Sequence, residues 1–513
     1  MDSHIIIKTP FHKDRDTEFS TLWALQADSG ARVRLSSADR LGSIHIQYTA
    51  VHSLGRSSIR PRQQQRRSAG FLDRTPQRQR SLGSSDWIRQ QRHKAFPNSA
   101  RSNATAPFVN STISTNATTS ANTTDFSGLR GVNIGGWLVL EAWMNADLFD
   151  NTSAVDQYTF DQTDGAAAKL QNHWDTYFME SDVQQIAAWG LNALRIPIGY
   201  WAYNNSNTPY ISGADAYLEK AIGWARKYGL KVLVDCHGSP GSQNGYDNSG
   251  HAGTVDWQSD ENLQTSISVL ETMAAKYGAA SYADVVFALE MVNEPISWGA
   301  NTFATTQTWA ARAYAAITAQ AANPTLTIIM HDAFQGPANW TALSTHLNRN
   351  PLLHINASAP TFAIDTHLYQ NQDSSSSSAA LTQPQHIAEA CAWSTTALSP
   401  DLPIYVGEFS AQTNVCANPD NSTSAGTSCN VAGCQCSADL EVREWGVPLK
   451  RATRMFFEAQ VEVFERGARG WFLWSWRGPG GWGLRELIAE GVLGERVGER
   501  EFGGLCGNGT GGA

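Results

Sequence analysis

Two glutamates stand at apolar runs that have the composition of buried β-strands. The run at residues 285–292 leads into Asn293 and Glu294, and the run at residues 404–409 contains Glu408. Two carboxylates on separate strands suit the cleavage of a glycosidic bond, because one acid must protonate the leaving oxygen while the other attacks the anomeric carbon or activates water. A single glutamate at a strand end is more often a salt-bridge partner, so the hypothesis depends on the pair.

Eight short apolar runs recur along the chain, which is the number of strands that closes a parallel barrel. They lie at residues 130–137, 193–199, 231–236, 285–292, 325–330, 362–366, 404–409 and 470–476. Segments with helical spacing lie between them, at residues 173–189, 214–228, 261–277, 305–321 and 449–466. In the second helix, Gly229 is the expected C-cap. The pattern predicts an α/β fold, a (β/α)8 TIM barrel, although the helices after Asp332 and Asp365 are hard to see.

In such a barrel the loops that follow the strands form the reactive face. The residues that close the apolar runs are Trp137, Glu141, Arg195, His237, Asn293, Glu294, His331, Asp332, His367, Tyr369, Glu408 and Trp474. A metal site built from His237, His331, Asp332 and His367 is an alternative. The chain has no close-spaced ligand pair and no Gly-rich phosphate loop after a first strand, so we expect no metal, no nucleotide and no other cofactor.

The composition narrows the class of protein and its organisation. The 513 residues include 18 Trp and 42 Gly with only 17% charged residues, which favours a large aromatic-lined domain. The net charge of -9 argues against a nucleic-acid binder. We expect a basic, disordered extension at residues 1–101, with a nucleic-acid or anionic-wall tether as the alternative. A Ser/Thr/Asn-rich glycosylated linker at 102–125, the barrel at 126–507 and a tail at 508–513 would follow.

The cysteines and the glycosylation acceptors both indicate a secretory compartment. Cys236 stands alone and is predicted to be a buried free thiol, while the other six cysteines fall in the last quarter and can pair. Asn-X-Ser/Thr acceptors occur at Asn103, Asn110, Asn116, Asn122, Asn151, Asn204, Asn339, Asn356, Asn421 and Asn508. We expect an extracellular or cell-wall monomer with no transmembrane segment. Residues 1–8 hold no apolar segment as long as a signal peptide, so we expect the true translation start to differ.

Three longer motifs resemble the fungal exo-β-1,3-glucanase group of glycoside hydrolase family 5. They are GVNIGGWLVLE at residues 131–141, LRIPIGYW at 194–201 and HGSPGSQNGYDNSG at 237–250. The resemblance runs from about residue 126 to residue 507. It implies a retaining mechanism with Glu294 as acid/base and Glu408 as nucleophile. Retention would place their carboxyl groups roughly 5–5.5 Å apart, against roughly 6.5–9.5 Å for inversion.

The same resemblance implies roles for the residues around the two acids. Arg195 would keep Glu408 ionised by charge-assisted hydrogen bonds, and Asn293 would bind the 2-hydroxyl of the sugar. The first sugar site would be formed by His237, His367 and Tyr369, with Trp474 as the platform beneath the ring, Glu141 and Asp247 on the outer hydroxyls and Tyr246 at the aromatic entrance.

The loop after Glu408 departs from the family pattern. Exo-acting members usually carry an Arg-Tyr loop that helps to close the pocket, whereas this chain has NPDNSTSAGTSC at residues 418–429. By the resemblance, Cys391 pairs with Cys506. The other four, Cys416, Cys429, Cys434 and Cys436, could form two bridges, and a bond between Cys434 and Cys436 would be strained.

The predicted function is therefore the release of glucose from the non-reducing ends of β-1,3-glucan, with the β-glucan polysaccharide or oligosaccharide as partner. Action on β-1,6-glucan or on internal bonds is the alternative within the same fold. An alternative of another class is a catalytically silent wall-binding protein. Such a protein should have lost one acid or its support, and every supporting residue is present.

Overall fold

The computed structural model describes residues 128–349, 361–370, 381–398, 402–438 and 440–507, and the backbone of residues 122–123. The extension predicted at residues 1–101, most of the predicted linker at 102–125 and the tail predicted at 508–513 lie outside this part of the chain. Within the predicted linker, Asn122–Thr123 (β1) pairs antiparallel with Glu499–Arg500 (β13). The backbone before the barrel is thus joined to a C-terminal segment.

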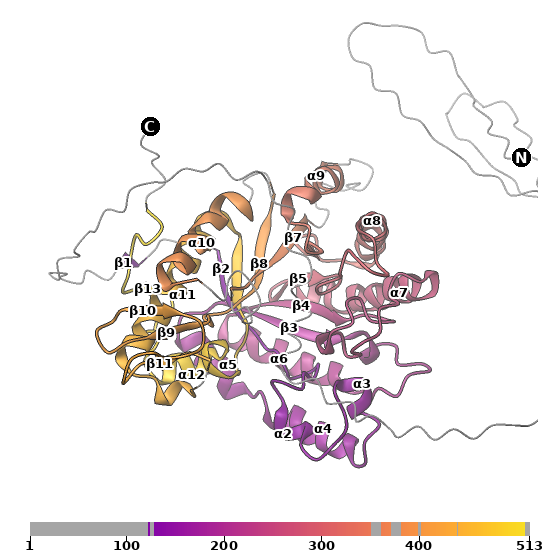
Figure 1. Ribbon diagram of the computed structural model, residues 1–513. Helices are drawn as coiled ribbons and strands as arrows, with labels where there is room; N and C mark the ends of the chain where they lie inside the picture. The colour runs from indigo at the N-terminus through magenta and orange to yellow at the C-terminus, as the bar shows by residue number, and fades with distance from the viewer. Residues whose placement is uncertain are drawn as a thin grey trace, which may run out of the picture. The chain divides into compact units, whose positions relative to one another are not determined.

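Eight parallel strands form a closed barrel with helices around its outside (Figure 1). The strands are Leu129–Asn133 (β2), Ala193–Gly199 (β3), Lys231–Gly238 (β4), Val286–Glu290 (β5), Thr327–His331 (β6), Thr361–Leu368 (β7), Ile404–Phe409 (β8) and Gly470–Leu473 (β12). β12 pairs with both β2 and β8 and so closes the barrel. Each of the eight predicted runs overlaps one strand, and the predicted (β/α)8 TIM barrel is confirmed.

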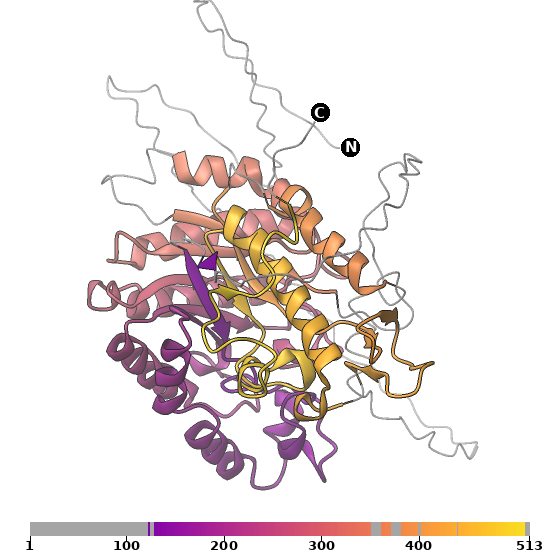
Figure 2. The ribbon, with the colours of Figure 1, turned by 90° about the vertical axis from the view of Figure 1, so that its left-hand side faces the viewer.

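Helices connect the strands and cover them from outside. The longer ones are Ala166–Thr176 (α4), Glu180–Ala188 (α5), Ala214–Tyr228 (α6), Asp260–Tyr277 (α7), Phe303–Gln320 (α8), Thr341–Arg349 (α9), Gln383–Thr396 (α10) and Val447–Gly467 (α11). Short helices lie at Ala146–Phe149 (α2), Gln157–Phe160 (α3), Leu484–Ala489 (α12), Tyr200–Ala202 (η1), Asp247–Ser249 (η2), Ala280–Tyr282 (η3), Pro337–Trp340 (η4), Val442–Glu444 (η6) and Gly480–Trp482 (η7). In the side view of Figure 2, the gold helix of the C-terminal half lies in front of the strands.

Local sequence explains several helix ends. Gly229 follows α6 with φ of +75°, so the predicted C-cap is confirmed, and only glycine adopts this angle without cost. The single helix predicted at residues 173–189 is wrong, because the chain forms α4 and α5 with a break at Met179. Met179 is extended, and its N–H donates to the Asp182 carboxylate at 2.8 Å. That side-chain cap begins a new helix where hydrophobic spacing alone shows none.

The barrel interior is filled in layers along the strands. An apolar layer near the amino ends of seven strands consists of Ala193, Leu233, Ala288, Ile329, Ala363, Tyr405 and Phe472. Alternate residues of a strand point to the same face, so the residue two positions later also points inward. Those positions are Arg195, Asp235, Glu290, His331, Asp365, Gly407 and Trp474. The apolar layer therefore supports a mostly polar layer nearer the carboxyl ends.

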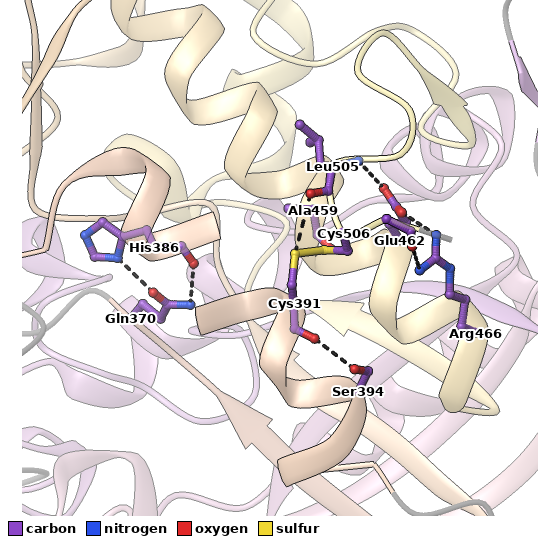
Figure 3. The surroundings of a disulfide bond; sticks show 10 residues. Gln370, His386, Cys391, Ser394, Ala459, Glu462, Arg466, Leu505 and Cys506 are labelled. Carbon is purple, nitrogen blue, oxygen red and sulfur yellow. Dashed lines mark hydrogen bonds and ion pairs between the residues drawn. A yellow bond between two sulfur atoms is a disulfide. The ribbon is translucent and has the colours of Figure 1, made fainter. Parts of the chain in front are cut away.

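A disulfide joins α10 to the C-terminal segment, as Figure 3 shows. Cys391 on α10 is bonded to Cys506, which lies beside Ala459 of α11. In the same view, His386 Nδ1 lies 2.8 Å from the Gln370 side-chain oxygen. Because Gln370 lies two residues after the end of β7, this pair joins the end of that strand to α10. The disulfide between Cys391 and Cys506, which the resemblance implies, is confirmed.

The remaining cysteines lie in the segment that follows β8. Val415–Ala417 (β9) is the central strand of a small sheet with Thr423–Ala425 (β10) and Gln435–Cys436 (β11). Disulfides join Cys416 to Cys436 and Cys429 to Cys434. Cys236 is a buried free thiol, as predicted. Within the described part of the chain, no helix has both the length and the apolar character needed to cross a bilayer.

Candidate active site

Glu294 lies in the turn after β5 and is almost fully buried. Its backbone φ is +46°, which residues other than glycine rarely adopt. Gln243 supports this turn by donating from Nε2 to the carbonyl oxygen of Asn293 at 2.8 Å. One carboxylate oxygen accepts from Asn248 Nδ2 at 3.0 Å, and the other lies 2.8 Å from His367 Nδ1. Unusual backbone angles that the surroundings maintain cluster at functional positions.

Glu408 on β8 faces the same histidine. Its Oε1 accepts a hydrogen bond from Arg195 at 2.9 Å, and its Oε2 accepts one from the Tyr369 hydroxyl at 2.7 Å. Its Oε2 also lies 3.4 Å from His367 Nδ1. The fourth and seventh strands of the barrel thus bring Glu294 and Glu408 to one ring nitrogen.

Arg195 on β3 occupies the centre of the barrel and is fully buried. Besides Glu408, it donates to Glu290 at 2.8 Å and to Asn293 Oδ1 at 2.8 Å, and it lies 3.1 Å from Asp235. Burial opposes the charged guanidinium, but the surrounding acids outweigh it and raise the pKa of Arg195. It also donates to Asn133 Oδ1 at 3.0 Å, so one buried cation holds several acids and two amides in fixed positions.

Two histidines of the site are each held by an aspartate two residues earlier on the same strand. His237 Nδ1 lies 2.6 Å from Asp235 on β4, and His367 Nε2 lies 3.2 Å from Asp365 on β7. Sequence analysis proposed both histidines but missed both aspartates. The repeated Asp-X-His pattern was the available signal, since residues two apart in a strand share a face.

The residues expected to bind sugar gather around the two glutamates. Trp474 stacks on His237, with ring centroids 5.5 Å apart and planes 10° from parallel. Glu141 is buried and accepts from Trp143 Nε1 at 2.9 Å. Burial and repulsion by Asp247 raise the pKa of Glu141 well above its usual range.

Asp247 and Tyr246 lie in the loop after β4, near the same cluster of acids. Burial is the largest influence on Asp247 and raises its pKa to about 7. Tyr246 is buried, and its pKa is raised by burial and by the charge of Glu294. Because both residues follow β4, they lie at the carboxyl end of the barrel strands.

Several buried polar atoms of this site have no hydrogen-bond partner among the described residues. They include Glu141 Oε1, His237 Nε2, Asp247 Oδ1 and Asn293 Nδ2, and also Asp235 Oδ1, Glu290 Oε1 and His331 Nε2. Buried polar groups are normally satisfied, so unmatched donors and acceptors gathered at one site are suited to a polar ligand. Sugar hydroxyls, which both donate and accept, match such a mixed set.

The protonation of the two glutamates is coupled through His367. Burial works against a charged His367, but the charges of Glu408 and Asp365 outweigh it and raise its pKa well above the usual range. Burial alone would raise the pKa of Glu294, yet the hydrogen bond and charge of His367 lower it overall. Burial raises the pKa of Glu408, against the opposing effects of His367 and Arg195. The directions of these shifts favour a proton on His367 over a proton on either carboxylate.

Two overlapping groups in this cluster have the residue types of metal ligands. Glu294, His331 and His367 place one ligand-type atom each within 4.8 Å of one another, and so do Glu290, Asp365 and His367. His331 accepts the Ala333 N–H on Nδ1 at 3.0 Å. A metal bound here would replace the hydrogen bond between Glu294 and His367. The alternative metal set proposed from the sequence is met only in part, because His237 and Asp332 belong to neither group.

The start of the segment that follows β8 packs beside the site. The Gln412 side chain accepts the Gly481 N–H at 2.8 Å, and the Ala411 N–H donates to the Gly481 carbonyl at 3.1 Å. The neighbouring Trp482 packs on Tyr369, with ring centroids 5.3 Å apart. The segment after β8 is thus linked through η7 to the tyrosine that contacts Glu408.

Comparison with known proteins places this site in a family. Over residues 156–436 the sequence matches the cellulase family, glycosyl hydrolase family 5. It is 35% identical over 408 residues to probable glucan 1,3-beta-glucosidase A of Aspergillus fumigatus, a match that covers 75% of this chain and 92% of that protein. It is 34% identical over 395 residues to glucan 1,3-beta-glucosidase 1 of Schizosaccharomyces pombe, covering 74% of this chain and 91% of the relative.

A solved structure agrees with the fold. The crystal structure of rutinosidase from Aspergillus niger has a TM-score of 0.55 with 20% sequence identity, covering 72% of this chain and 98% of that one. This likeness concerns the architecture alone. The family match spans more than half of the chain, and the relatives align over most of their own length. The chain belongs to glycoside hydrolase family 5 and is a glycoside hydrolase.

Proposed function

We propose that this glycoside hydrolase releases glucose from the non-reducing ends of β-1,3-glucan with retention of configuration. Glu294 would be the acid/base and Glu408 the nucleophile. The observation that carries the proposal is the convergence of both carboxylates on His367 Nδ1, at 2.8 and 3.4 Å. The distance between Glu294 Oε1 and Glu408 Oε2 therefore cannot exceed the sum of these two distances. Carboxylates close enough to share one atom support retention, for which the carboxyl groups lie roughly 5–5.5 Å apart.

In the first step, Glu408 attacks the anomeric carbon while Glu294 gives its proton to the leaving oxygen, so that a glycosyl ester forms and the glycosidic bond breaks. In the second step, Glu294 takes a proton from water, which attacks the same carbon and releases Glu408 as a carboxylate. Hydrogen bonds from Arg195 and Tyr369 to Glu408 support its charged form at the start and at the end of this cycle.

The unmatched polar atoms support a sugar as the ligand. Asn293 uses Oδ1 for Arg195, which leaves Nδ2 for the 2-hydroxyl of the sugar. His237 uses Nδ1 for Asp235, and its Nε2 remains for another hydroxyl. Trp474 presents an aromatic face suited to the apolar face of a glucose ring.

The choice of β-1,3-linked ends rests on the relatives, which carry the name glucan 1,3-beta-glucosidase at 34–35% identity. Action on β-1,6-glucan or on internal bonds is the alternative, because the segment after Glu408 differs from the family pattern. Product analysis on defined β-1,3- and β-1,6-linked oligosaccharides separates these activities. Glucose as the first product from β-1,3-linked chains is expected, and initial oligosaccharide products would contradict exo action.

The assignment of the two acids is tested with Glu294→Ala and Glu408→Ala. Each change is expected to remove nearly all glucose release from laminarin, whereas Glu261→Ala, an exposed glutamate in the first turn of α7, should keep it. With a 2,4-dinitrophenyl glucoside, whose leaving group needs no proton, added azide should give a β-glucosyl azide with Glu294→Ala and an α-glucosyl azide with Glu408→Ala. In Glu294→Ala azide replaces the water of the second step, and in Glu408→Ala it replaces the missing nucleophile. Wild-type-like turnover by either variant would refute the assignment.

A silent wall-binding protein is tested by the same preparations. It would bind insoluble β-glucan without turnover by the unaltered chain. Both acids and the Arg195 that contacts Glu408 are in place, which supports catalysis instead. Proton NMR of the first-formed sugar tests retention, with the β-anomer expected and an initial α-anomer counting against it.

We also propose that the protein is secreted and glycosylated. The three disulfides support an oxidising compartment. The described acceptor residues Asn151, Asn204, Asn339 and Asn421 are all exposed. A loss of mass on treatment with an N-glycosidase, together with amino-terminal sequencing of protein from culture medium, tests this proposal.

A further inference from the structure

We infer that Asp365 is a positioning residue for catalysis, which holds a proton on His367 Nε2 so that Nδ1 faces Glu294. Through this arrangement, Glu294 and His367 share the proton that reaches the leaving oxygen. The inference rests on the proposed role of Glu294 as acid/base. The geometry is a chain of contacts from Asp365 to His367 at 3.2 Å and from His367 to Glu294 at 2.8 Å.

The two ring nitrogens of His367 have different neighbours. Nε2 is close to Asp365, whereas Nδ1 lies between Glu294 at 2.8 Å and Glu408 at 3.4 Å. An acceptor on one nitrogen of a histidine decides which nitrogen carries the proton in the neutral ring. With Nε2–H donating to Asp365, Nδ1 can accept from a protonated Glu294, or carry its own proton and donate to the Glu294 carboxylate.

The proton can therefore move without any change in the contact with Asp365. In the starting state the imidazolium donates from Nδ1 to the Glu294 carboxylate. Transfer of that proton to Glu294 leaves a neutral His367, and Glu294 then passes the proton to the leaving oxygen. Glu294 regains a proton from the attacking water in the second step and returns it to His367, so the starting state is restored.

Both carboxylate oxygens of Asp365 act as hydrogen-bond acceptors. Oδ2 is the acceptor for His367, while Oδ1 accepts the Gly407 N–H at 2.5 Å. A Cβ added to Gly407 would lie 1.8 Å from Asp365 Oδ2, so this approach requires glycine. Gly407 directly precedes Glu408, the proposed nucleophile, and His367 contacts Glu294, the proposed acid. The Asp365 carboxylate therefore contacts residues on both sides of the site.

Asparagine cannot replace this double acceptor. It offers one oxygen and one NH2 group, whereas two N–H groups converge on Asp365. If its oxygen stays on the backbone N–H of Gly407, its NH2 faces His367 Nε2 and favours the tautomer protonated on Nδ1. That tautomer donates to the Glu294 carboxylate permanently and cannot accept a proton from it.

Other charged and titratable groups also face His367 or its partners. They are Arg195 on β3, Glu290 on β5, Glu294 after β5, His331 and Asp332 at the end of β6, Glu408 on β8 and Tyr369 after β7. Burial opposes a charge on His367, and Glu408 and Asp365 are the main groups that raise its pKa. Removal of the Asp365 charge should therefore make His367 lose its proton at lower pH.

The kinetic test compares Asp365→Asn with the unaltered protein on two glucosides. A 2,4-dinitrophenyl glucoside has a leaving group that needs no proton, whereas a phenyl glucoside needs one. We expect kcat/KM for the phenyl glucoside to fall about 10²-fold, the lower end of the range for general acid catalysis, and that for the dinitrophenyl glucoside to change by less than about threefold. The alkaline limb of kcat/KM should move to lower pH. Equal losses on both substrates with an unmoved limb would overturn the inference.

A second measurement is independent of turnover. In 15N-histidine-labelled protein, the His367 ring signals are identified by their absence from His367→Gln and followed against pH. Asp365→Asn should lower the pH at which His367 loses its proton and move the remaining proton to Nδ1. An unchanged His367 titration in Asp365→Asn would overturn the inference, whether or not the protein is active. If the unaltered protein hydrolysed neither glucoside, that result would refute the proposed function instead.

Asp161→Asn is the matched control for the loss of a buried carboxylate. Asp161 accepts the Ile211 N–H at 2.8 Å in the segment before α6. This variant should leave the ratio of the two kcat/KM values and the His367 titration unchanged. A change in either quantity would show that they report general loss of structure, which would contradict the inference.

Discussion

Replacement of Arg195 tests how the buried cation holds the centre of the barrel. Its guanidinium lies 2.8 Å from Glu290, 2.9 Å from Glu408 and 3.1 Å from Asp235, and it is fully buried. In Arg195→Met, these buried acids remain without their counter-charge. Loss of one partner from a buried ion pair costs about 3–5 kcal/mol, so we expect a decrease of that size in the free energy of unfolding at pH 7.

Two further variants separate charge from geometry. Arg195→Lys keeps the positive charge but loses the planar fork that reaches Glu290, Glu408 and Asn293 together, and we expect it to cost about 1.5–3 kcal/mol. Arg226→Met is the surface control, because Arg226 pairs with Asp284 at 2.6 Å while the side chains are 41% and 56% exposed. Exposed pairs contribute roughly 0–1 kcal/mol, so this change should have little effect.

The loss of stability in Arg195→Met should depend on pH, and the direction of that dependence can be predicted. Arg195 lowers the pKa of Glu290 and of Glu408, so both pKa values should rise in folded Arg195→Met. An acid whose folded-state pKa is above its unfolded value destabilises the fold at high pH, and this cost decreases as pH falls and the acid is protonated. Urea unfolding followed by tryptophan fluorescence at pH 7 and pH 5 measures it. A deficit below about 1 kcal/mol at pH 7, or one that does not shrink at pH 5, would refute the reasoning.

Four further predictions concern the site and its supports. Gly407→Ala should reduce glucose release more than about tenfold, since its Cβ would displace Asp365, and near-normal turnover would count against the double-acceptor geometry. Trp474→Ala should raise KM about tenfold by removing the aromatic platform, and an unchanged KM would argue against sugar stacking there. The paired change Cys391→Ser and Cys506→Ser should cost about 2–5 kcal/mol in denaturant unfolding, because the disulfide spans 115 residues; a loss below this range would contradict the estimate. Since the pKa of Glu408 is raised above the ordinary value of about 4.3, the acid limb of kcat/KM should lie above that pH, and a limb at or below it would contradict the raised pKa.

Much of the barrel was visible in the sequence because strand and helix periodicities are local. The strands at Ala193–Gly199 and Ile404–Phe409 have the predicted bounds, and α6 begins and ends at the predicted residues. The break at Met179 was missed because one side-chain cap ended a continuous helical pattern. The sequence analysis gave no bounds for α9 and α10, and α9 has only nine residues, so it holds few repeats of the helical spacing.

The alternation of strand residues could have identified more of the site than the pattern search did. Counting two residues from the apolar layer leads to Asp235, Glu290 and Asp365, which are all fully buried. Sequence analysis considered strand ends rather than this inward layer. It also passed over Asn248, which contacts Glu294, and Gln243, which contacts the backbone of Asn293, because the motif does not show which of its members reach the turn after β5.

By itself, the sequence determined that two glutamates stand at the ends of parallel strands in a (β/α)8 barrel, because buried strands and amphipathic helices leave periodic signals along the chain. Only the tertiary structure decided that both acids meet at one nitrogen of His367 and that Asp365 contacts the other. Those contacts join side chains from different strands, and their distances depend on barrel closure and on rotamers that no local pattern records.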